Sequence, residues 1–149
     1  MNLDFISKMN TSNFYTYQPD ILGNGYQQLT LNFADDYDGK VVATLVRKKA
    51  AQSTKKAVLY VHGFTDYFFQ KEMAEQFNQH GYDFYALDLR KYGRSKLPHQ
   101  TLYYVRDLRE YDAEISKSLE IISQENHNQV LLAGHSTGGL ITTLYAAHY

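Results

Sequence analysis

The chain has 149 residues, a formal net charge of −1 and neither Cys nor Trp, and 44% of its residues are hydrophobic. This composition is typical of a globular protein, and the length suits one domain of roughly 100–200 residues. The near-neutral charge gives no electrostatic reason to expect nucleic acid or an anionic membrane as a partner. A chain without Cys cannot form a disulfide scaffold, a thiolate metal site or a cysteine nucleophile. Its apolar runs fall short of the ~20 residues that span a bilayer, and no signal peptide is recognisable, so we expect a cytoplasmic location.

The first part of the chain is predicted to be an irregular lead-in followed by a β-hairpin. Residues 1–26 show little periodicity and include a Gly-Asn-Gly turn signal at 23–25. Leu29, Leu31 and Phe33 then alternate with polar residues, which puts them on one face of a strand. A turn at 35–39 separates this strand from a second apolar run at 41–47, and the two runs predict an antiparallel pair.

From residue 57 the pattern changes to strand, loop and helix, three times over. Nearly unbroken apolar runs are typical of strands that are buried on both faces of a parallel sheet. The expected strands are 57–61, 82–87 and 129–133, and the expected helices are 66–80, 103–124 and 137–149. Gly81 is placed to end the first of these helices. The order predicts an α/β fold with a mostly parallel sheet, helices on both faces and an N-terminal antiparallel hairpin. We expect residues 1–149 to belong to one domain, with 1–26 as its irregular lead-in and 27–149 as the hairpin and the strand–helix units.

A nucleophile is predicted at Ser136, within the sequence Gly134-His135-Ser136-Thr137-Gly138. This Gly-x-Ser-x-Gly pattern lies between an apolar strand and a helix, which is the context in which it indicates a nucleophilic serine. Glycine at 134 and 138 would allow the chain to reverse sharply and to hold Ser136 in a strained conformation. The hydroxyl would then lie above a helix N-terminus, which favours a developing anion. The alternative is a tight turn without chemistry.

The loop after the first buried strand is the candidate second half of an oxyanion hole. A serine attacking a carbonyl creates a negative oxygen, which two backbone N–H groups can hold. One donor would be the residue after the nucleophile, Thr137, and the other the amide of Phe64. His62 and Gly63 precede Phe64, and Gly63 would let the backbone turn close to a ligand. Alternatively, Gly63 only permits a sharp turn between strand and helix.

Together these segments resemble the α/β-hydrolase superfamily, and within it the branch of serine aminopeptidases, lysophospholipases and monoacylglycerol-lipase-like enzymes. The segments that carry the resemblance are the hairpin, Val61-His62-Gly63-Phe64, the loop Asp88-Leu89-Arg90-Lys91-Tyr92-Gly93-Arg94-Ser95, and Gly134 to Gly139. The match covers about residues 28–149. It implies a Ser–His–Asp hydrolase that acts on a small-molecule ester, thioester or amide and needs no cofactor or metal. The resemblance gives His62, Gly63, Gly134 and Gly138 supporting roles in the two turns.

The acid and base of such a triad are absent from the expected positions. The family order is Ser, then Asp or Glu, then His, but residues 137–149 contain no carboxylate. His148 would lie roughly 16 Å from Ser136 along a helix that rises about 1.5 Å per residue, too far for a hydrogen bond. We therefore expect this chain to be the N-terminal portion of a longer hydrolase and to be inactive alone. The rest of the protein, or a second copy in a dimer, would cover the open edge of strand 129–133. The alternative is a non-catalytic binding or assembly module that has lost the triad.

The remaining charged and aromatic residues favour structural interpretations. Asp66 is expected to start a helix and Asp88 to brace its loop. Arg90, Lys91 and Arg94 are expected to be solvated loop charges, with recognition of an anionic substrate as the alternative.

Tyr67-Phe68-Phe69 is expected to pack in the core, with an acyl pocket as the alternative. Three further histidines are expected at the surface or at helix caps, namely His80, His99 and His127.

Overall fold

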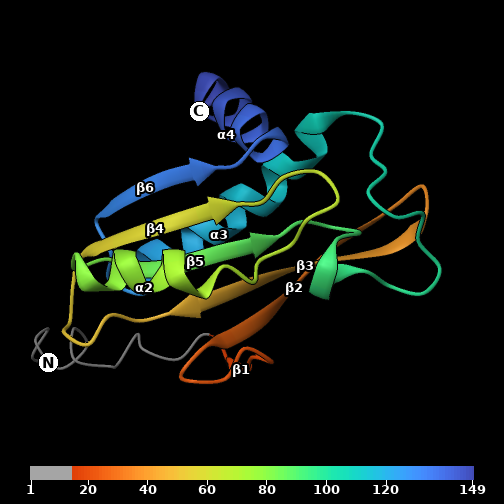
Figure 1. The fold of residues 1–149 in the computed structure, drawn as a ribbon. Helices are drawn as coiled ribbons and strands as arrows, with labels where there is room; N and C mark the ends of the chain where they lie inside the picture. Colours follow the sequence, from red (N-terminus) through yellow and green to blue (C-terminus); the bar gives the residue numbers. More distant parts are fainter. Residues whose placement is uncertain (1–14) are drawn as a thin grey trace, which may run out of the picture.

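The computed structural model describes residues 15–149, which form a six-stranded sheet with helices on both faces (Figure 1). The strands are β1 (Gln18–Pro19), β2 (Gln27–Asp36), β3 (Gly39–Lys48), β4 (Lys56–Val61), β5 (Asp83–Asp88) and β6 (Gln129–Gly134). The helices are α2 (Lys71–Gln79), α3 (Asp112–Gln124) and α4 (Thr137–His148), with short 3₁₀ turns η1 (Gly93–Ser95) and η2 (Leu108–Tyr111). The predicted α/β class is confirmed.

The strand order is β1-β2-β3-β5-β4-β6, with β4 between its two parallel neighbours β5 and β6. β2 and β3 form the predicted antiparallel hairpin, in which Leu31 lies opposite Ala43. β3 pairs antiparallel with β5, so Thr44 lies opposite Asp88. As a result, the hairpin turn and the carboxyl ends of β4, β5 and β6 meet at one edge of the sheet, where ligands bind in open α/β folds.

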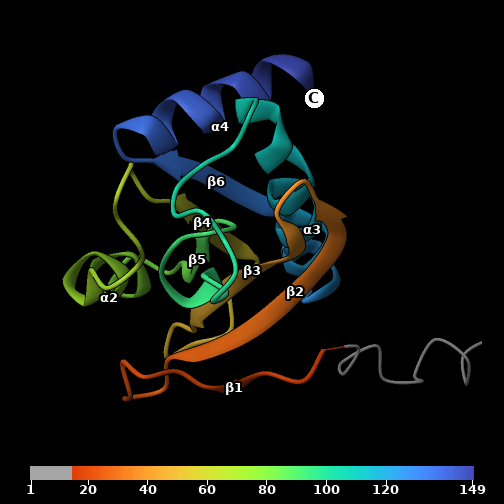
Figure 2. The same ribbon diagram turned by 90° about the vertical axis from the view of Figure 1, so that its right-hand side faces the viewer.

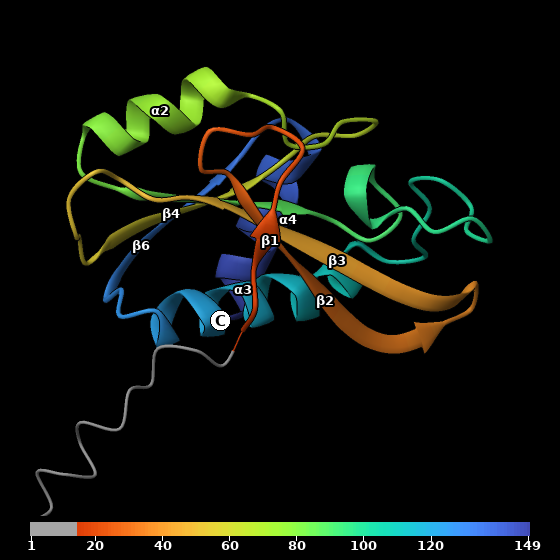
Figure 3. The same ribbon diagram turned by 90° about the horizontal axis from the view of Figure 1, so that it is seen from below.

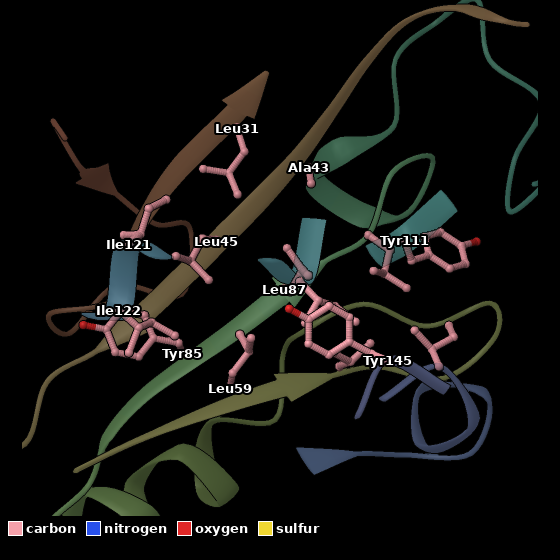
Figure 4. Close-up of a cluster of buried hydrophobic side chains, with 14 of the residues drawn as sticks. Leu31, Ala43, Leu45, Leu59, Tyr85, Leu87, Tyr111, Ile121, Ile122 and Tyr145 are labelled. Carbon is pink, nitrogen blue, oxygen red and sulfur yellow. The ribbon is translucent and has the colours of Figure 1, made fainter. Parts of the chain in front are cut away.

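Two hydrophobic cores hold the layers together, one on each face of the sheet. Figure 3 shows α2 on one side and α3 on the other, and Figure 2 shows α4 beyond β6. The larger core joins the sheet to α3 and α4 through residues such as Leu59, Leu87, Ile115 and Tyr145 (Figure 4). The smaller core packs α2 against the opposite face. It consists of Tyr26, Val46, Val58, Tyr60, Phe68, Ala74, Phe84 and Ala86.

The segment before the hairpin is more ordered than the prediction of an irregular lead-in. Residues 1–14 of that prediction lie outside the described part of the chain. β1 pairs with the start of β2, so Gln18 lies opposite Gln28. Tyr26 is buried, and its ring lies against that of Phe68 with centroids 6.2 Å apart. This part of the lead-in therefore contributes to the smaller core.

The first crossover helix begins five residues later than expected, at Lys71 instead of Asp66. The prediction fails because Phe68 is fully buried and its N–H donates to the carboxylate of Asp88 at 2.8 Å, which ties the segment to β5 in a non-helical path. The end of the helix is as predicted. Gly81 adopts a φ of +83°, a left-handed conformation that glycine adopts without strain.

The second crossover helix also begins later than expected, because residues 103–107 are not helical. Tyr103 has a φ of +61°, which is incompatible with a right-handed helix. Asp107 then forms a capping box with Glu110: its carboxylate accepts from Arg109 N–H, and Glu110 accepts from the N–H of Asp107. The helical segment therefore starts at Leu108 as a 3₁₀ turn and continues as α3 from Asp112.

β6 lies at the edge of the sheet and is only partly buried, whereas the sequence pattern predicted a strand covered on both faces. Leu131 at its centre is 47% exposed. Within residues 15–149, β6 pairs with β4 alone, as expected from the sequence. None of the helices in this range has the length and apolar character needed to cross a membrane.

Candidate active site

Ser136 stands at the bend between β6 and α4. Its φ of 54° and ψ of −120° place it in a conformation that residues with a side chain seldom adopt. Such a backbone costs on the order of 1–3 kcal/mol and persists only where the surrounding structure enforces it. The residue is exposed, and α4 begins immediately after it at Thr137. The bend therefore presents the hydroxyl group to solvent at the N-terminus of a 12-residue helix.

Two glycines make this bend sterically feasible. A Cβ added to Gly134 would lie 2.4 Å from the carbonyl oxygen of Gly138, and one added to Gly138 would lie 2.2 Å from the carbonyl oxygen of Val61. Both distances are far below van der Waals contact with backbone atoms that cannot move aside. Gly139 is different, because its nearest neighbour would be 3.6 Å away.

The loop after β4 packs directly against the bend. A Cβ on Gly63 would lie 3.3 Å from the Cβ of Ser136 and 3.3 Å from the carbonyl oxygen of His135. The amide of His135 also donates to the carbonyl of Val61 at 3.1 Å. The structure thus brings the residues around Ser136 together with His62, Gly63 and Phe64.

The two candidate oxyanion donors belong to these neighbouring segments. Thr137 is the first residue of α4, so its N–H has no partner within the helix. In the described part of the chain, 15–149, no backbone acceptor bonds the amide of Phe64 or of Thr137. The next two amides of α4 are already engaged, since Gly138 N–H bonds to His135 and Gly139 N–H to Ser136. The Phe64 side chain is 59% exposed.

His62 has both ring nitrogens occupied and supports the loop instead of facing solvent. Its Nδ1 lies 2.8 Å from the carbonyl of Gly63, and its Nε2 accepts the N–H of Leu89 at 3.1 Å. Because a carbonyl only accepts and an amide only donates, the ring is the neutral form that carries its proton on Nδ1. Burial lowers the pKa of His62, which favours the same neutral form.

Asp88 braces the loop after β5, as expected from the sequence. Its carboxylate is fully buried and accepts from Phe68 N–H at 2.8 Å, Arg94 N–H at 3.0 Å and the Arg94 guanidinium at 2.9 Å. Arg94 also forms a two-pronged ion pair with Asp20, through bonds of 2.7 and 2.9 Å. Arg94 is therefore a largely buried structural cation whose guanidinium is occupied by two carboxylates, so both the solvated and the anion-binding interpretations of this residue are wrong.

A comparison with family models shows to which protein family this chain belongs. The family model for serine aminopeptidase, S33, matches residues 52–149. This match contains β4, β5, β6 and the three helices with the loops that surround Ser136. The chain belongs to this family of α/β-hydrolases.

The chain is also similar to individual proteins that are longer than itself. It is 31% identical over 102 residues to mouse (Mus musculus) epoxide hydrolase 4, and the match covers 67% of this chain and 26% of that protein. A carboxyl esterase from Bacillus coagulans superimposes with a TM-score of 0.66 at 20% identity, covering 80% of this chain and 40% of the esterase. The α/β-hydrolase GrgF from Penicillium sp. sh18 gives a TM-score of 0.63 at 23% identity, covering 82% and 42%. The two structures share the fold of this chain, which spans less than half the length of each of these relatives.

A second charged cluster joins the hairpin turn of this chain to α3. Lys91 is fully buried, with Nζ 2.9 Å from the carboxylates of both Asp36 and Asp38. Arg90 binds the buried carboxylate of Glu114 through its guanidinium and, at 2.9 Å, through its backbone N–H. Arg90 and Lys91 are therefore not solvated loop charges. Burial raises the pKa of Glu114 to about 7, although Arg90 opposes this shift.

The other histidines lie away from Ser136 or serve packing. His148 is at the far end of α4, where its Nε2 is 3.5 Å from Arg109. His127 was predicted at the surface or at a helix cap. It is buried, and it bridges Asp83 at 2.8 Å and the carbonyl of Ile122, in the last turn of α3, at 3.0 Å.

The prediction that the aromatic segment 67–69 packs in the core is confirmed for one of its three residues. Phe68 is in the core, whereas Tyr67 and Phe69 are 45% and 51% exposed. Sequence reasoning missed Tyr103, whose ring contacts that of Phe64 at a centroid distance of 5.7 Å. A left-handed tyrosine in a loop has no signature in the sequence that would have marked it.

Proposed function

We propose that the protein containing this chain is a serine hydrolase that cleaves an ester, thioester or amide through an acyl-enzyme on Ser136. The observation that carries the proposal is the exposed, backbone-strained Ser136 at the N-terminus of α4, beside the carboxyl ends of parallel strands. Strain of this kind persists where function requires it, and binding sites of open α/β sheets gather at this edge.

In the proposed reaction, Ser136 Oγ gives its proton to the triad base and attacks the substrate carbonyl carbon, and the carbonyl π electrons move to the carbonyl oxygen. The N–H groups of Phe64 and Thr137 donate to the resulting oxyanion. Collapse of this intermediate expels the alcohol, thiol or amine, which takes up a proton, and leaves Ser136 acylated. Water then attacks the acyl group by the same steps and releases the acid.

We propose that the acid and base of the triad come from polypeptide beyond residue 149. His62 is neutral with both nitrogens engaged, the Asp88 carboxylate is occupied by Arg94 and Phe68, and His148 lies at the other end of α4. The greater length of epoxide hydrolase 4 and of the esterase supports this assignment, since the chain spans 26% and 40% of them. On this proposal the 149-residue chain is the N-terminal portion of one catalytic domain and is inactive alone.

The esterase activity named for the Bacillus coagulans protein favours small acyl esters as substrates, in line with an esterase- or lysophospholipase-like enzyme. We also place the enzyme in the cytoplasm, a reducing compartment that suits a chain without cysteine.

The proposal is tested by treating the complete protein with a fluorophosphonate probe and mapping the modified residue by mass spectrometry. We expect the probe to label Ser136. The Ser136→Ala variant should lose both the labelling and the ester turnover. The control Ser123→Ala, which changes an exposed serine of α3, should keep both. A complete protein that resists the probe while remaining folded would instead support a non-catalytic binding or assembly module. The 149-residue chain should give no turnover above that of its Ser136→Ala variant.

A further inference from the structure

A continuous row of aromatic rings runs from the buried end of β4 to the exposed loop beside Ser136. The ring of His62 lies 4.7 Å from that of Tyr92, and Tyr92 lies 4.8 Å from Tyr103. Tyr103 in turn meets Phe64 nearly edge to face, at 5.7 Å and 70°. The row begins at His62 and ends at Phe64, within three residues of the loop after β4, so it braces this loop from outside.

Tyr103 reaches this position through an unusual backbone. Its φ is +61°, and its N–H donates to the carbonyl of Lys91 at 3.4 Å. A tyrosine in a left-handed conformation is strained, and the helix predicted from this residue begins only after it. The strain turns the ring of Tyr103 back toward Tyr92 and Phe64.

Phe64 has little other support. Its ring is 59% exposed, and Tyr103 is its one aromatic partner among residues 15–149. On one side it follows Gly63, which has no side chain to pack, and on the other it precedes Thr65, which itself has a φ of 56°. The contact with Tyr103 therefore restrains the Phe64 end of the peptide that carries the Phe64 amide, while the His62 Nδ1 hydrogen bond of 2.8 Å holds the Gly63 carbonyl of the same peptide.

We propose that Tyr103 is a positioning residue that fixes the Phe64 amide where an oxyanion forms next to Ser136. This inference rests on the proposed serine-hydrolase function. Because donors of an oxyanion hole act only when they are oriented in advance, a loop that moves by about 1 Å loses rate without losing ground-state binding. The role of Tyr103 belongs to its ring, since its hydroxyl is not needed for the contact with Phe64.

The test compares variants of the complete protein in the hydrolysis of p-nitrophenyl acetate. Tyr103→Asn removes the ring but suits a left-handed backbone, so it separates the ring from the conformation. We expect it to lower kcat about ten-fold while KM stays within about two-fold, and to slow fluorophosphonate labelling of Ser136 by the same factor. Tyr103→Phe keeps the ring and should restore kcat to within about two-fold of wild type.

The matched control is Tyr104→Asn, which changes the next tyrosine in the loop, whose ring contacts Tyr37 instead of Phe64. It should leave kcat unchanged. Phe64→Leu keeps the amide but removes the other ring of the contact, and should lower kcat as Tyr103→Asn does. The double variant should be no slower than either single one, because both remove the same contact.

Wild-type kcat in Tyr103→Asn or in Phe64→Leu would overturn the role of Tyr103, as would a Tyr103→Phe variant as slow as Tyr103→Asn. If Tyr103→Asn does not fold, the kcat of Phe64→Leu tests the positioning role instead, because Phe64 is exposed and its replacement should not disrupt the fold. A wild-type protein that neither hydrolyses the ester nor labels at Ser136 would overturn the proposed function itself. An active wild type with unaffected variants would overturn the positioning role alone.

Discussion

The bend at Ser136 depends on residues that have no side chain at all. Gly134 faces Gly138 across the bend, and Gly138 faces the end of β4, each at a distance that excludes a methyl group. Gly63 has slightly more room, since its nearest neighbours would lie at 3.3 Å. The exposed hydroxyl of Ser136 is therefore held by close backbone packing of two strand ends.

Replacing Gly138 with Ala should destabilise the fold and slow fluorophosphonate labelling of Ser136. The added methyl would lie 2.2 Å from the Val61 carbonyl oxygen and 2.4 Å from that of His62, so β4 and α4 must separate. Overpacking of this kind costs about 1–3 kcal/mol or more, which urea denaturation measures directly. Gly139→Ala is the matched control, because 3.6 Å is ordinary contact and alanine favours a helix. Equal stability of the two variants would contradict the steric argument.

The sequence predicted the environment of Ser136 well and that of the charged residues poorly. The Gly-x-Ser-x-Gly pattern is local, so five neighbouring residues carry the information for the bend. Arg94 pairs with Asp20, which is 74 positions away, and His127 pairs with Asp83, which is 44 positions away. Nothing near these residues in the sequence indicates their partners, so a solvated interpretation was the natural one.

At the scale of elements, every long strand and helix was predicted, and the main errors concern where helices begin. Asp107 and Glu110 have the spacing of a capping box, so the sequence does contain the signal for the start at Leu108. The start of α2 has no such signal. Gln70 makes no capping hydrogen bond through its side chain, and the helix begins where the buried Phe68 allows it.

Glu114 should make the stability of the protein fall as pH rises from about 4.5 to about 7. Its pKa is raised from 4.5 to about 7 by burial in α3, so the folded state binds a proton that the unfolded state has released. The stabilisation is complete below pH 4.5 and is lost as pH passes 7, a change of about 3 kcal/mol at 1.36 kcal/mol per pKa unit. Chemical denaturation between pH 4.5 and 8 measures it.

Glu114→Gln should remove this part of the pH dependence. Glu120→Gln changes an exposed residue of the same helix and should keep the wild-type profile. An unaltered profile in Glu114→Gln would assign the effect to another group.

At the scale of the whole molecule, the sheet ends in a strand that has a partner on one side only. β6 pairs with β4, Leu131 at its centre is 47% exposed, and Val130 and Leu132 beside it are only half-buried. An exposed, apolar edge of this kind is a template for pairing with further strands. The chain matches 26% of epoxide hydrolase 4 and 42% of GrgF, so these relatives have further polypeptide available for that pairing.

The 149-residue chain alone should therefore associate through β6. Sedimentation velocity over a range of concentrations should show dimers or larger species, and Leu131→Lys should shift them toward monomer, because lysine disfavours edge pairing. Leu140→Lys introduces the same charge on α4, at a residue that is 51% exposed, and should leave association unchanged. A chain that is monomeric at all concentrations, or equal effects of the two variants, would count against the edge as the contact.

The ion pair between Arg94 and Asp20 limits how far the N-terminal part of this protein can be shortened. A version trimmed to start at the first long strand would lose the carboxylate that holds two prongs of a buried guanidinium, together with the Tyr26 ring that covers Phe68. Arg94 would keep Asp88 as a partner, so the loss is smaller than the ~3–5 kcal/mol that an uncompensated buried charge costs, but it is still large beside the stability of a small domain. Expression designs should therefore begin upstream of residue 18, because residues that precede the first long strand contribute to the stability of the domain.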